Sequence, residues 1–291
     1  MCHNILLRNY QKEIESCLFD NWEHKQNILV QMPTGTGKTH LLASVIYDHL
    51  EEEQGQCVWI VAHRRELVVQ IVETVARYGI STEDGRVKVM SIQWLSRHWE
   101  DVKGERPSLI VIDEAHHTLA ETYMELWLRY PNVKKLGMTA TPCRLNRKGF
   151  TDLFDTLITS DSIADFIRQG WLSAFDYVSI RTDSEDQRLI NNLEKRGADG
   201  DFQVKEMDTM LNKRPSIERL YESVRQYADG KKGIVYAISI SHARNIAEYY
   251  KGQGLNAVAI DSKTPAKVRK QLVDDFKGGK IQVLVNVDVF S

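Results

Sequence analysis

Residues 27–50, NILVQMPTGTGKTHLLASVIYDHL, join a short apolar run, a glycine-containing loop and a segment with helical spacing. A strand that leads through such a loop into a helix brings backbone N–H groups and the positive end of the helix to one point, where they can bind phosphate. The standard phosphate-loop pattern begins with glycine, whereas this sequence has Met32 there. Because that position shapes the bend and supplies no phosphate ligand, we still predict a phosphate loop.

Four residues of the loop match the chemistry that a nucleotide requires. Gly35 and Gly37 allow the backbone to turn tightly and to approach the phosphates. Lys38 can reach the β- and γ-phosphates, and the hydroxyl of Thr39 can bind Mg²⁺. The loop alone leaves a second interpretation open, which is a glycine-rich turn in an unrelated α/β protein.

The acidic pair Asp113 and Glu114 favours the nucleotide interpretation. The pair directly follows the apolar residues LIVI at 109–112, which argues against a solvated surface pair. A carboxylate at the end of a neighbouring parallel strand is where Mg²⁺ needs a second ligand. We predict that Asp113 holds Mg²⁺ and that Glu114 orients and deprotonates the attacking water. The loop and the acidic pair together predict a nucleoside triphosphatase.

The surrounding sequence alternates short apolar runs with longer stretches of helical spacing. Runs that are apolar almost throughout are typical of strands buried on both faces of a parallel sheet. The predicted strands are residues 27–31, 58–62, 87–92, 108–113 and 135–140, with helices at 38–53 and 65–78. Repeated strand–helix units predict an α/β domain with a doubly wound parallel sheet over residues 1–160.

Beyond this first domain the sequence changes character twice. Residues 182–230 are polar and charged with helical spacing, so we expect a helical connector over residues 161–230. The strand–helix rhythm then resumes, with predicted strands at 233–238, 256–261 and 281–286 and a helix at 268–276. Since three strands make a small sheet, we expect residues 231–291 to form an incomplete second α/β domain.

The overall composition argues against several classes of protein. The chain of 291 residues has a net charge of −2, so any nucleic-acid surface must be local. The scattered cysteines Cys2, Cys17, Cys57 and Cys143 predict free thiols in a reducing compartment. No apolar run approaches the roughly 18 residues of a membrane span, and the N-terminus is too polar for a secretory signal. We therefore expect a cytoplasmic protein.

Eight short segments together carry a family resemblance that covers nearly the whole chain. In chain order they are LRNYQ (7–11), MPTGTGKT (32–39), VAHRREL (61–67), VMSIQWL (89–95), DEAHH (113–117), GMTATPCR (137–144), GIVYAISISHAR (233–244) and VLVNVDVF (283–290). Each segment is modest evidence alone, whereas their common order and spacing are specific. In these segments the chain resembles the superfamily 2 helicases, in the DEAH-type branch close to the motor subunits of type III restriction enzymes.

The resemblance implies two P-loop RecA-like domains, with ATP bound to the first and covered by the second, and Mg²⁺ as the metal. It also implies that Gln11 reads adenine. The residues it places at the nucleotide are Gln11, Thr34, Gly35, Thr36, Gly37, Lys38 and Thr39. Lys38, Asp113 and Glu114 take the catalytic roles, and Thr39 and Asp113 are the metal ligands.

Three further residues match the positions that couple the phosphate site to a nucleic-acid strand in this family. They are His116, Thr139 and Thr141. Their alternative role is simple strand-end structure, because threonine suits strands and a histidine can be a satisfied buried polar group. The order of the motifs favours coupling.

The resemblance further implies a nucleic acid, DNA rather than RNA, that is held mainly by its backbone with low sequence preference. Arg64 and Gln93 are the candidate contacts, with Arg65, Ser91 and Arg144 as further candidates. Each of these can equally be an ordinary solvated residue.

Three tryptophans, Trp94, Trp99 and Trp127, are candidate stacking platforms for bases. Trp127 belongs to a helical stripe with Met124 and Leu128, and this stripe predicts core packing instead. Trp94 and Trp99 stay unassigned.

The sequence departs from the family pattern near its last residues. In the family, the last of these segments (283–290) continues with a glycine and an acidic residue, and a further motif supplies an arginine that reaches the γ-phosphate. No arginine follows Arg269 here. A missing arginine finger lowers phosphoryl-transfer rates by roughly 10³–10⁵-fold. We expect either a truncated product of a longer gene or a second polypeptide that completes the site.

These features support two functions. The leading hypothesis is an ATP-dependent helicase or translocase that acts on DNA. The alternative is a nucleotide-dependent module for nucleic-acid binding or assembly, with little turnover of its own. A nuclease is a weaker third hypothesis, because the sequence contains no separate carboxylate–lysine cluster to carry it.

Overall fold

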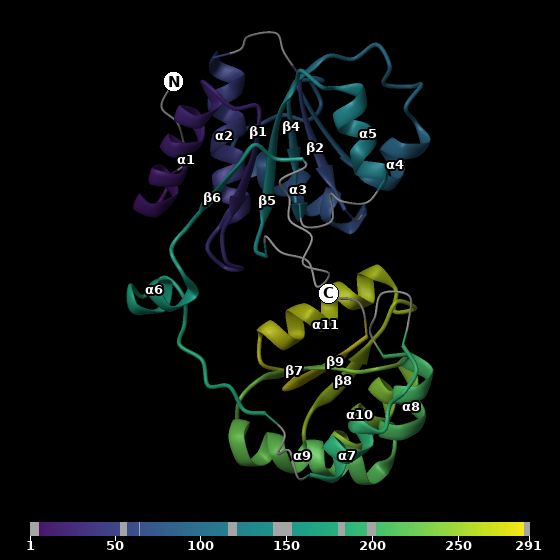
Figure 1. Cartoon of the computed structure of the whole chain (residues 1–291). Helices are drawn as coiled ribbons and strands as arrows, with labels where there is room; N and C mark the ends of the chain where they lie inside the picture. Colours follow the sequence, from purple (N-terminus) through teal and green to yellow (C-terminus); the bar gives the residue numbers. More distant parts are fainter. Residues whose placement is uncertain are drawn as a thin grey trace. The chain divides into compact units, whose positions relative to one another are not determined.

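The computed structural model describes residues 6–52, 57–63, 65–115, 121–141, 153–179, 184–196 and 202–287 (Figure 1). The chain divides into two compact units, Met1–Phe175 and Asp176–Ser291. We expected boundaries at residues 160 and 230, with a helical connector between them. In the structure, the residues of that connector are shared between the two units.

The first unit is built on a sheet of six parallel strands (Figure 1). The strand order is β3-β2-β4-β5-β1-β6. The strands are β1 (Asn27–Gln31), β2 (Cys57–Ala62), β3 (Val87–Ser91), β4 (Pro107–Ile112), β5 (Lys134–Thr139) and β6 (Thr156–Thr159). The first five lie within one residue of the predicted strands, which confirms the expected parallel α/β sheet. The edge strand β6 was not predicted.

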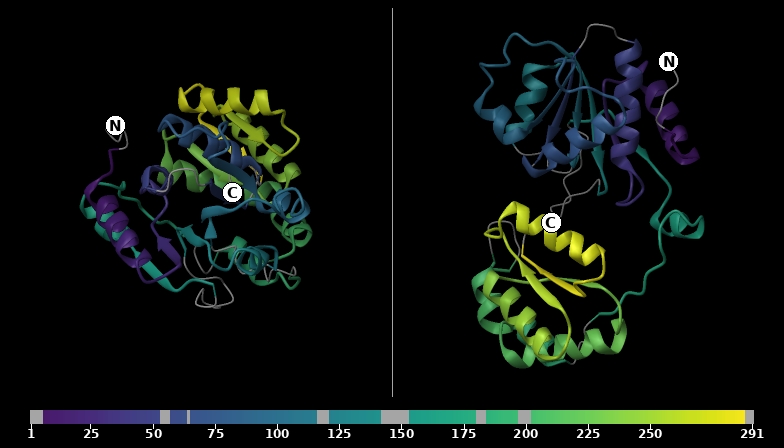
Figure 2. Two further views of the ribbon diagram at one scale, coloured as in Figure 1. Left: turned by 90° about the horizontal axis from the view of Figure 1, so that it is seen from above. Right: turned by 180° about the vertical axis from the view of Figure 1, so that it is seen from behind.

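Helices cover both faces of this sheet (Figure 2). The core on one face joins α1 (Asn9–Trp22), α2 (Lys38–Glu52) and α3 (Arg65–Arg77) to alternate strand residues such as Ile28 and Val30. The core on the other face joins α4 (Ile92–Arg97) and α5 (Glu121–Arg129) to intervening residues such as Leu29. Because successive strand residues point to opposite faces, strands that are apolar throughout fill both cores. No helix in the described part of the chain is both long and apolar enough to cross a membrane.

The short helix α6 (Ile163–Arg168) packs on the first unit, although we expected its residues in the connector. Its start is capped by Ser162, whose Oγ accepts a hydrogen bond from the N–H of Asp165 at 3.2 Å. Phe166 is fully buried in the core that contains α1 and α2. Its ring meets Tyr10 edge to face, with ring centroids 4.9 Å apart. One apolar side chain thus docks a segment whose surroundings are polar.

The second unit contains a parallel sheet of three strands in the order β7-β9-β8. The strands are β7 (Gly233–Tyr236), β8 (Ala257–Ile260) and β9 (Val283–Asn286), each within two residues of a predicted strand. The helices are α7 (Glu185–Asn191), α8 (Val204–Leu211), α9 (Arg214–Ala228), α10 (Ile240–Gly252) and α11 (Ala266–Lys277). Ile217 of α9 is buried with Ile246 of α10 against the sheet. The expected connector therefore supplies a core helix of the second unit.

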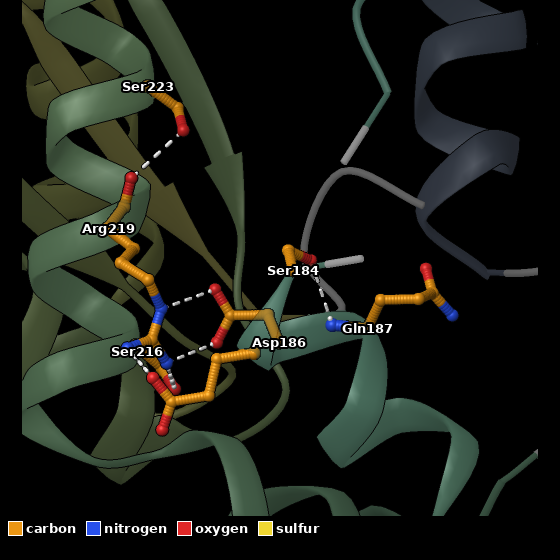
Figure 3. Close-up of polar contacts among 7 residues, drawn as sticks. Ser184, Asp186, Gln187, Ser216, Arg219 and Ser223 are labelled. Carbon is orange, nitrogen blue, oxygen red and sulfur yellow. Dashed lines mark hydrogen bonds and ion pairs between the residues drawn. The ribbon is translucent and has the colours of Figure 1, made fainter. Parts of the chain in front are cut away.

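A polar cluster ties α7 to α9 (Figure 3). The guanidinium of Arg219 donates from Nε to Asp186 Oδ2 at 2.9 Å and from Nη2 to Oδ1 at 2.7 Å. Its Nη1 donates to Glu185 Oε2 at 2.8 Å. These bonds hold the pKa of Asp186 below its usual value, although partial burial opposes them. Since α7 has no buried residue, charge-assisted hydrogen bonds and not apolar packing fix it in place.

Candidate nucleotide-binding site

The loop of residues 32–37 leaves β1 at the carboxyl edge of the first sheet and leads into α2. The N–H of Met32 donates to the carbonyl oxygen of Thr139 in β5 at 2.9 Å. Nζ of Lys38 donates back to the Met32 carbonyl oxygen at 3.4 Å. The Met32 side chain is fully buried in the core below the loop. The position that standard phosphate loops fill with glycine therefore carries a core residue here.

Both glycines of the loop have backbone conformations that other residues rarely adopt. Gly35 has φ 86° and Gly37 has φ 82°, which is the left-handed region. A Cβ atom on Gly37 would lie 2.7 Å from Nε2 of Gln11, and one on Gly35 would lie 3.1 Å from Cδ2 of Leu172. The fold therefore requires glycine at both positions, and it keeps the backbone of the loop bare.

Gln11 and Tyr10 of α1 brace the loop from one side. Gln11 is buried, and its Nε2 donates to the carbonyl oxygens of Thr36 at 3.1 Å and Gly37 at 3.2 Å. Its Oε1 accepts from the N–H of Arg8 at 2.9 Å. The Tyr10 hydroxyl donates to the same Thr36 carbonyl at 2.8 Å. Gln11 thus holds the loop itself, and its reading of adenine stays a prediction. Tyr10 lies one residue before the glutamine, and no sequence pattern marks it as a residue of the site.

Arg8 and Trp171 form a stacked pair beside Tyr10. The guanidinium carbon of Arg8 lies 4.7 Å from the centroid of the Trp171 ring. The rings of Tyr10 and Trp171 meet edge to face with centroids 5.7 Å apart. Trp171 and Leu172 follow α6, in the segment that we expected to be connector. Contacts between residues about 160 positions apart leave no local pattern, so the sequence could not place this pair at the loop.

Asp113 and Glu114 leave β4 at the same edge of the sheet. The N–H of Asp113 donates to the Val61 carbonyl oxygen at 3.2 Å, which continues the pairing with β2. Burial raises the pKa of Asp113 to about 6, the charge of Glu114 adds to this, and the charge of Lys38 opposes it. Asp113 is therefore close enough to Glu114 and to Lys38 for both of their charges to shift its pKa.

Glu114 is the only non-glycine residue with positive φ among the described residues, at 51°. Its N–H donates to Oδ1 of Asp113 at 3.0 Å. A left-handed backbone costs about 1–2 kcal/mol for a residue with a side chain, and strain of this kind concentrates at functional sites. The sequence carried no signal of this conformation.

Tyr123 of α5 is a further residue near Asp113 that sequence analysis missed. Its side chain is buried, and its hydroxyl has no hydrogen-bond partner among the described residues. Burial raises the pKa of this hydroxyl above its usual range, and the charge of Asp113 raises it further. Tyr123 lies among apolar residues of its helix, so its sequence pattern is that of a core residue. That pattern does not indicate a role for its hydroxyl.

The predicted coupling residues are only partly within the described chain. Thr139 is buried at the end of β5, and its hydroxyl donates to the Thr141 carbonyl at 3.0 Å. The same oxygen accepts from the N–H of Thr141 at 3.1 Å. Thr139 thus holds both the strand end and, through its carbonyl, the phosphate loop. His116 lies outside the described residues.

The predicted nucleic-acid contacts fall in different places. Arg64 and Arg144 lie outside the described residues, and Arg65 begins α3. Gln93 is exposed on α4, and its Nε2 donates to the His63 carbonyl at 2.5 Å, which joins the ends of β2 and β3. Ser91 is buried and caps α4, accepting from the Trp94 N–H at 3.2 Å. A capping role accounts for Ser91.

The three candidate stacking tryptophans lie in different environments. Trp99 is buried, and its Nε1 donates to Glu125 Oε2 at 2.7 Å. Trp127 packs against the core and donates to the Leu153 carbonyl at 2.7 Å, so its predicted core role is confirmed. The predicted stripe was wrong, because Met124 and Leu128 are exposed. Trp94 is 42% exposed and is the most exposed of the three.

Two family models match the sequence. One describes the "Type III restriction enzyme, res subunit" and covers residues 4–144, and the other describes the "Helicase conserved C-terminal domain" and covers residues 213–291. A "51.5 kDa protein" of Lactococcus phage (isolate 7-9) is 31% identical over 263 residues, which are 90% of this chain and 55% of that protein. The "Putative ATP-dependent helicase IRC3" of Saccharomyces cerevisiae is 25% identical over 314 residues, covering 98% of this chain and 45% of that protein.

The helicase domain of Pyrococcus furiosus Hef has a similar fold. Its crystal structure matches with a TM-score of 0.60 and 17% identity, covering 97% of this chain and 86% of that one. This likeness confirms the expected RecA-like fold. The chain spans about half the length of the curated relatives given above. The family models and the helicase relatives show that the chain belongs to the superfamily 2 helicases, in a type III restriction-like family.

Proposed function

We propose that this chain is the motor part of an ATP-dependent helicase or translocase that acts on DNA and hydrolyses ATP with Mg²⁺. Its family membership supports the broader class of nucleic-acid helicases. One observation carries the chemistry. The glycine loop after β1 and the acidic pair after β4 leave the same edge of one sheet, on strands that only β5 separates.

The residues of this edge fit a nucleoside triphosphate and its metal. The conformations of Gly35 and Gly37 keep side chains away from the loop backbone, so its N–H groups can approach phosphate oxygens. Lys38 and Thr39 at the start of α2 would contact phosphate and metal, and Asp113 would complete the metal site. Mg²⁺, when bound, neutralises charge on the phosphate oxygens.

The raised pKa of Asp113 supports this assignment. Burial disfavours its ionised form, and a cation placed against a buried carboxylate restores that form. Asp113 is therefore a group that gains from a bound cation. No such gain would be available to an acidic pair that was already solvated.

Glu114 is the proposed general base, which orients a water molecule and accepts its proton during attack on the γ-phosphate. Its left-handed backbone turns the chain directly after Asp113. The two neighbouring carboxylates therefore do not follow the alternation of a strand, and they can serve different roles.

Thr139 is the proposed coupling residue, together with Thr141 and His116. Its carbonyl holds the N–H of Met32, and its hydroxyl holds Thr141. Thr139 would therefore couple a shift of the loop at Met32 to the segment after β5. Gln93 is the proposed contact to the DNA backbone, and Arg64 is proposed from the family pattern alone.

A second function would use the same edge of the sheet. The chain would then be a nucleotide-dependent module for nucleic-acid binding or assembly, which binds ATP at the loop and turns it over slowly by itself.

Steady-state phosphate release separates the two functions. We expect the chain to release phosphate from Mg-ATP faster when single- or double-stranded DNA is added, and Glu114→Gln to abolish the increase. Glu83→Gln, an exposed change outside the site, should keep it. Turnover that is slow and insensitive to DNA would reject the autonomous motor and favour the binding module.

A further inference from the structure

An open groove runs along the outer edge of β3 in the first unit. Its volume is about 920 Å³, and it is lined by α3, β3 and α4. The apolar part of the lining includes Val68 and Val72 of α3 and Val87 and Val89 of β3. β3 is the end strand of the sheet and pairs with β2 alone among the described strands. The groove therefore follows a strand edge that the described chain leaves uncovered.

Trp94 stands at this groove in a fixed orientation. Its ring stacks on the ring of His98, with centroids 4.5 Å apart and planes 6° from parallel. The Nδ1 of His98 donates to the Trp94 carbonyl at 2.7 Å, which holds the histidine in the stack. One face of the indole is thus covered, yet 42% of the residue is exposed. A flat partner would have to stack on the opposite face.

The charge of the groove favours an anionic partner. Among the side chains that the structure describes, its lining contains the basic residues Lys88, Arg97 and His98 and no carboxylate, although the whole chain has a net charge of −2. Lys88 is paired with Glu105, with Nζ and Oε1 2.6 Å apart. Arg97 is exposed and makes neither a hydrogen bond nor an ion pair with any described residue. It is therefore the cation that a phosphate group can reach.

The groove also adjoins the carboxyl edge of the sheet, where the candidate nucleotide site lies. Gln93 lines the groove, and its side chain is bonded to the His63 carbonyl just beyond β2. The carboxyl ends of β2 and β3 share one edge with the strands that carry the phosphate loop and Asp113. A strand of nucleic acid at this edge could place one nucleotide in the groove.

We propose that this groove binds single-stranded nucleic acid, with one unstacked base against the free face of Trp94 and a neighbouring phosphate at Arg97. This inference rests on the proposed function. An aromatic platform and an arginine in a positively charged groove are the elements that bind single strands without sequence preference. A protein segment added to the β3 edge would use the apolar walls, but it would need neither the stacked tryptophan nor the excess of positive charge.

The test compares two strands that differ only in their bases. A fluorescein-labelled strand of twelve thymidines and an abasic strand with the same number of phosphates are titrated with the full chain, and anisotropy is recorded at fixed low salt. We expect Trp94→Ala to weaken binding of the thymidine strand by about 5- to 150-fold, the range for one base–aromatic stack. Binding of the abasic strand should stay unchanged.

Matched variants separate stacking from charge and from damage to the fold. Trp94→Phe should recover most of the affinity, since it keeps an aromatic face. Arg97→Ala should weaken both strands alike and reduce the slope of log affinity against log salt by about one. Met124→Ala removes another exposed apolar side chain, outside the groove. It should change neither the affinity for the two strands nor the dependence on salt. Circular dichroism checks that each variant is folded.

The outcomes distinguish this inference from the proposed function. If the unmodified chain binds thymidine strands and Trp94→Ala binds them equally well, the helicase assignment stands and the groove proposal is overturned in favour of a protein segment. If Trp94→Ala lost equal affinity for both strands, the proposal would also be overturned, because the base would then contribute nothing to binding. If the unmodified chain binds neither strand, the proposed function fails as well.

Discussion

The sheets of the two units are stabilised in different ways. In the first unit, Ile28, Leu29 and Val30 of β1 are at most 1% exposed, and helices cover both faces. In the second unit, Ile234 and Tyr236 of β7 are 46% and 65% exposed. These residues lie on an edge strand, whereas the central strand β9 is buried, and the Arg219–Asp186 pair adds a polar contact between helices. The proposed chemistry lies at the ends of the fully packed strands, because close packing holds side chains to the positions that catalysis requires.

The largest expected effect tests this contrast in packing. Leu29→Ala in the first unit should lower the free energy of unfolding by about 2–5 kcal/mol, through lost burial and a remaining cavity. Ile234→Ala in the second unit should change it by only about 0.5 kcal/mol. Hydrogen exchange measured peptide by peptide, in increasing denaturant, reports each unit separately. Equal losses in the two units would remove the basis of the comparison.

A second prediction concerns the phosphate loop. Gly37→Ala forces a side chain into the left-handed region and against Gln11, so we expect ATP affinity to fall at least about tenfold, or about 1.4 kcal/mol. Gly79→Ala is the matched control, because Gly79 has φ 78° and open space around a Cβ. Gly79→Ala should lower the free energy of unfolding by about 1–2 kcal/mol through backbone strain. Its ATP affinity should stay unchanged. A loss of affinity in both variants would mean that strain alone matters.

Lys135 is the exception to the apolar interior of the first sheet. It is fully buried in β5, and its Nζ donates to the carbonyls of Tyr130 at 2.6 Å and Val133 at 3.0 Å. Burial lowers the pKa of Lys135 from 10.5 to about 8. Between these values the unfolded chain binds more protons, so stability should rise with pH, by an amount on the order of 1 kcal/mol.

Denaturant unfolding at about pH 7.5 and about pH 9.5 tests this effect against Lys135→Met, which removes the titrating group. The unmodified first unit should gain more stability between the two pH values than the variant does. Parallel pH profiles would show that Lys135 keeps its ordinary pKa in the folded protein.

The smallest expected effect lies in the second unit. Arg219→Lys keeps the charge but loses the paired hydrogen bonds to Asp186, and it should cost about 0.5–1 kcal/mol of stability. The exposed pair of Arg214 and Glu218 lies on the same helix, so Arg214→Lys is the control, with a cost near zero. Thermal unfolding followed by circular dichroism checks both. An equal effect at the two arginines would show that the cluster of Figure 3 adds nothing to the surface pair.

Much of the fold could be predicted because the strands of the first sheet are apolar on both faces. Such runs have a clear signal, and the phosphate loop and acidic pair follow directly from two of them. Strand β6 was missed because it is short and has a polar residue at each end, and the docking of α6 was missed because a single residue, Phe166, carries it. Met32 looked like a defect in a motif until its burial in the core was known.

The site was predicted less completely than the fold. Loop residues and strand-end carboxylates sit next to recognisable patterns, whereas Tyr10, Trp171 and Tyr123 reach the site through long-range packing. The left-handed backbone of Glu114 is likewise set by tertiary structure and has no counterpart in local sequence. The greater exposure of Trp94, which distinguishes it from Trp99 and Trp127, is also set by tertiary structure.

The most direct test of the account is the binding of Mg-ATP to the purified chain, measured by titration calorimetry. We predict binding at millimolar nucleotide or below, its loss in Lys38→Ala, and its retention in Lys103→Ala, an exposed lysine on the same unit. Failure of the unmodified chain to bind, or equal binding by Lys38→Ala, would contradict the assignment of this edge as a nucleotide site.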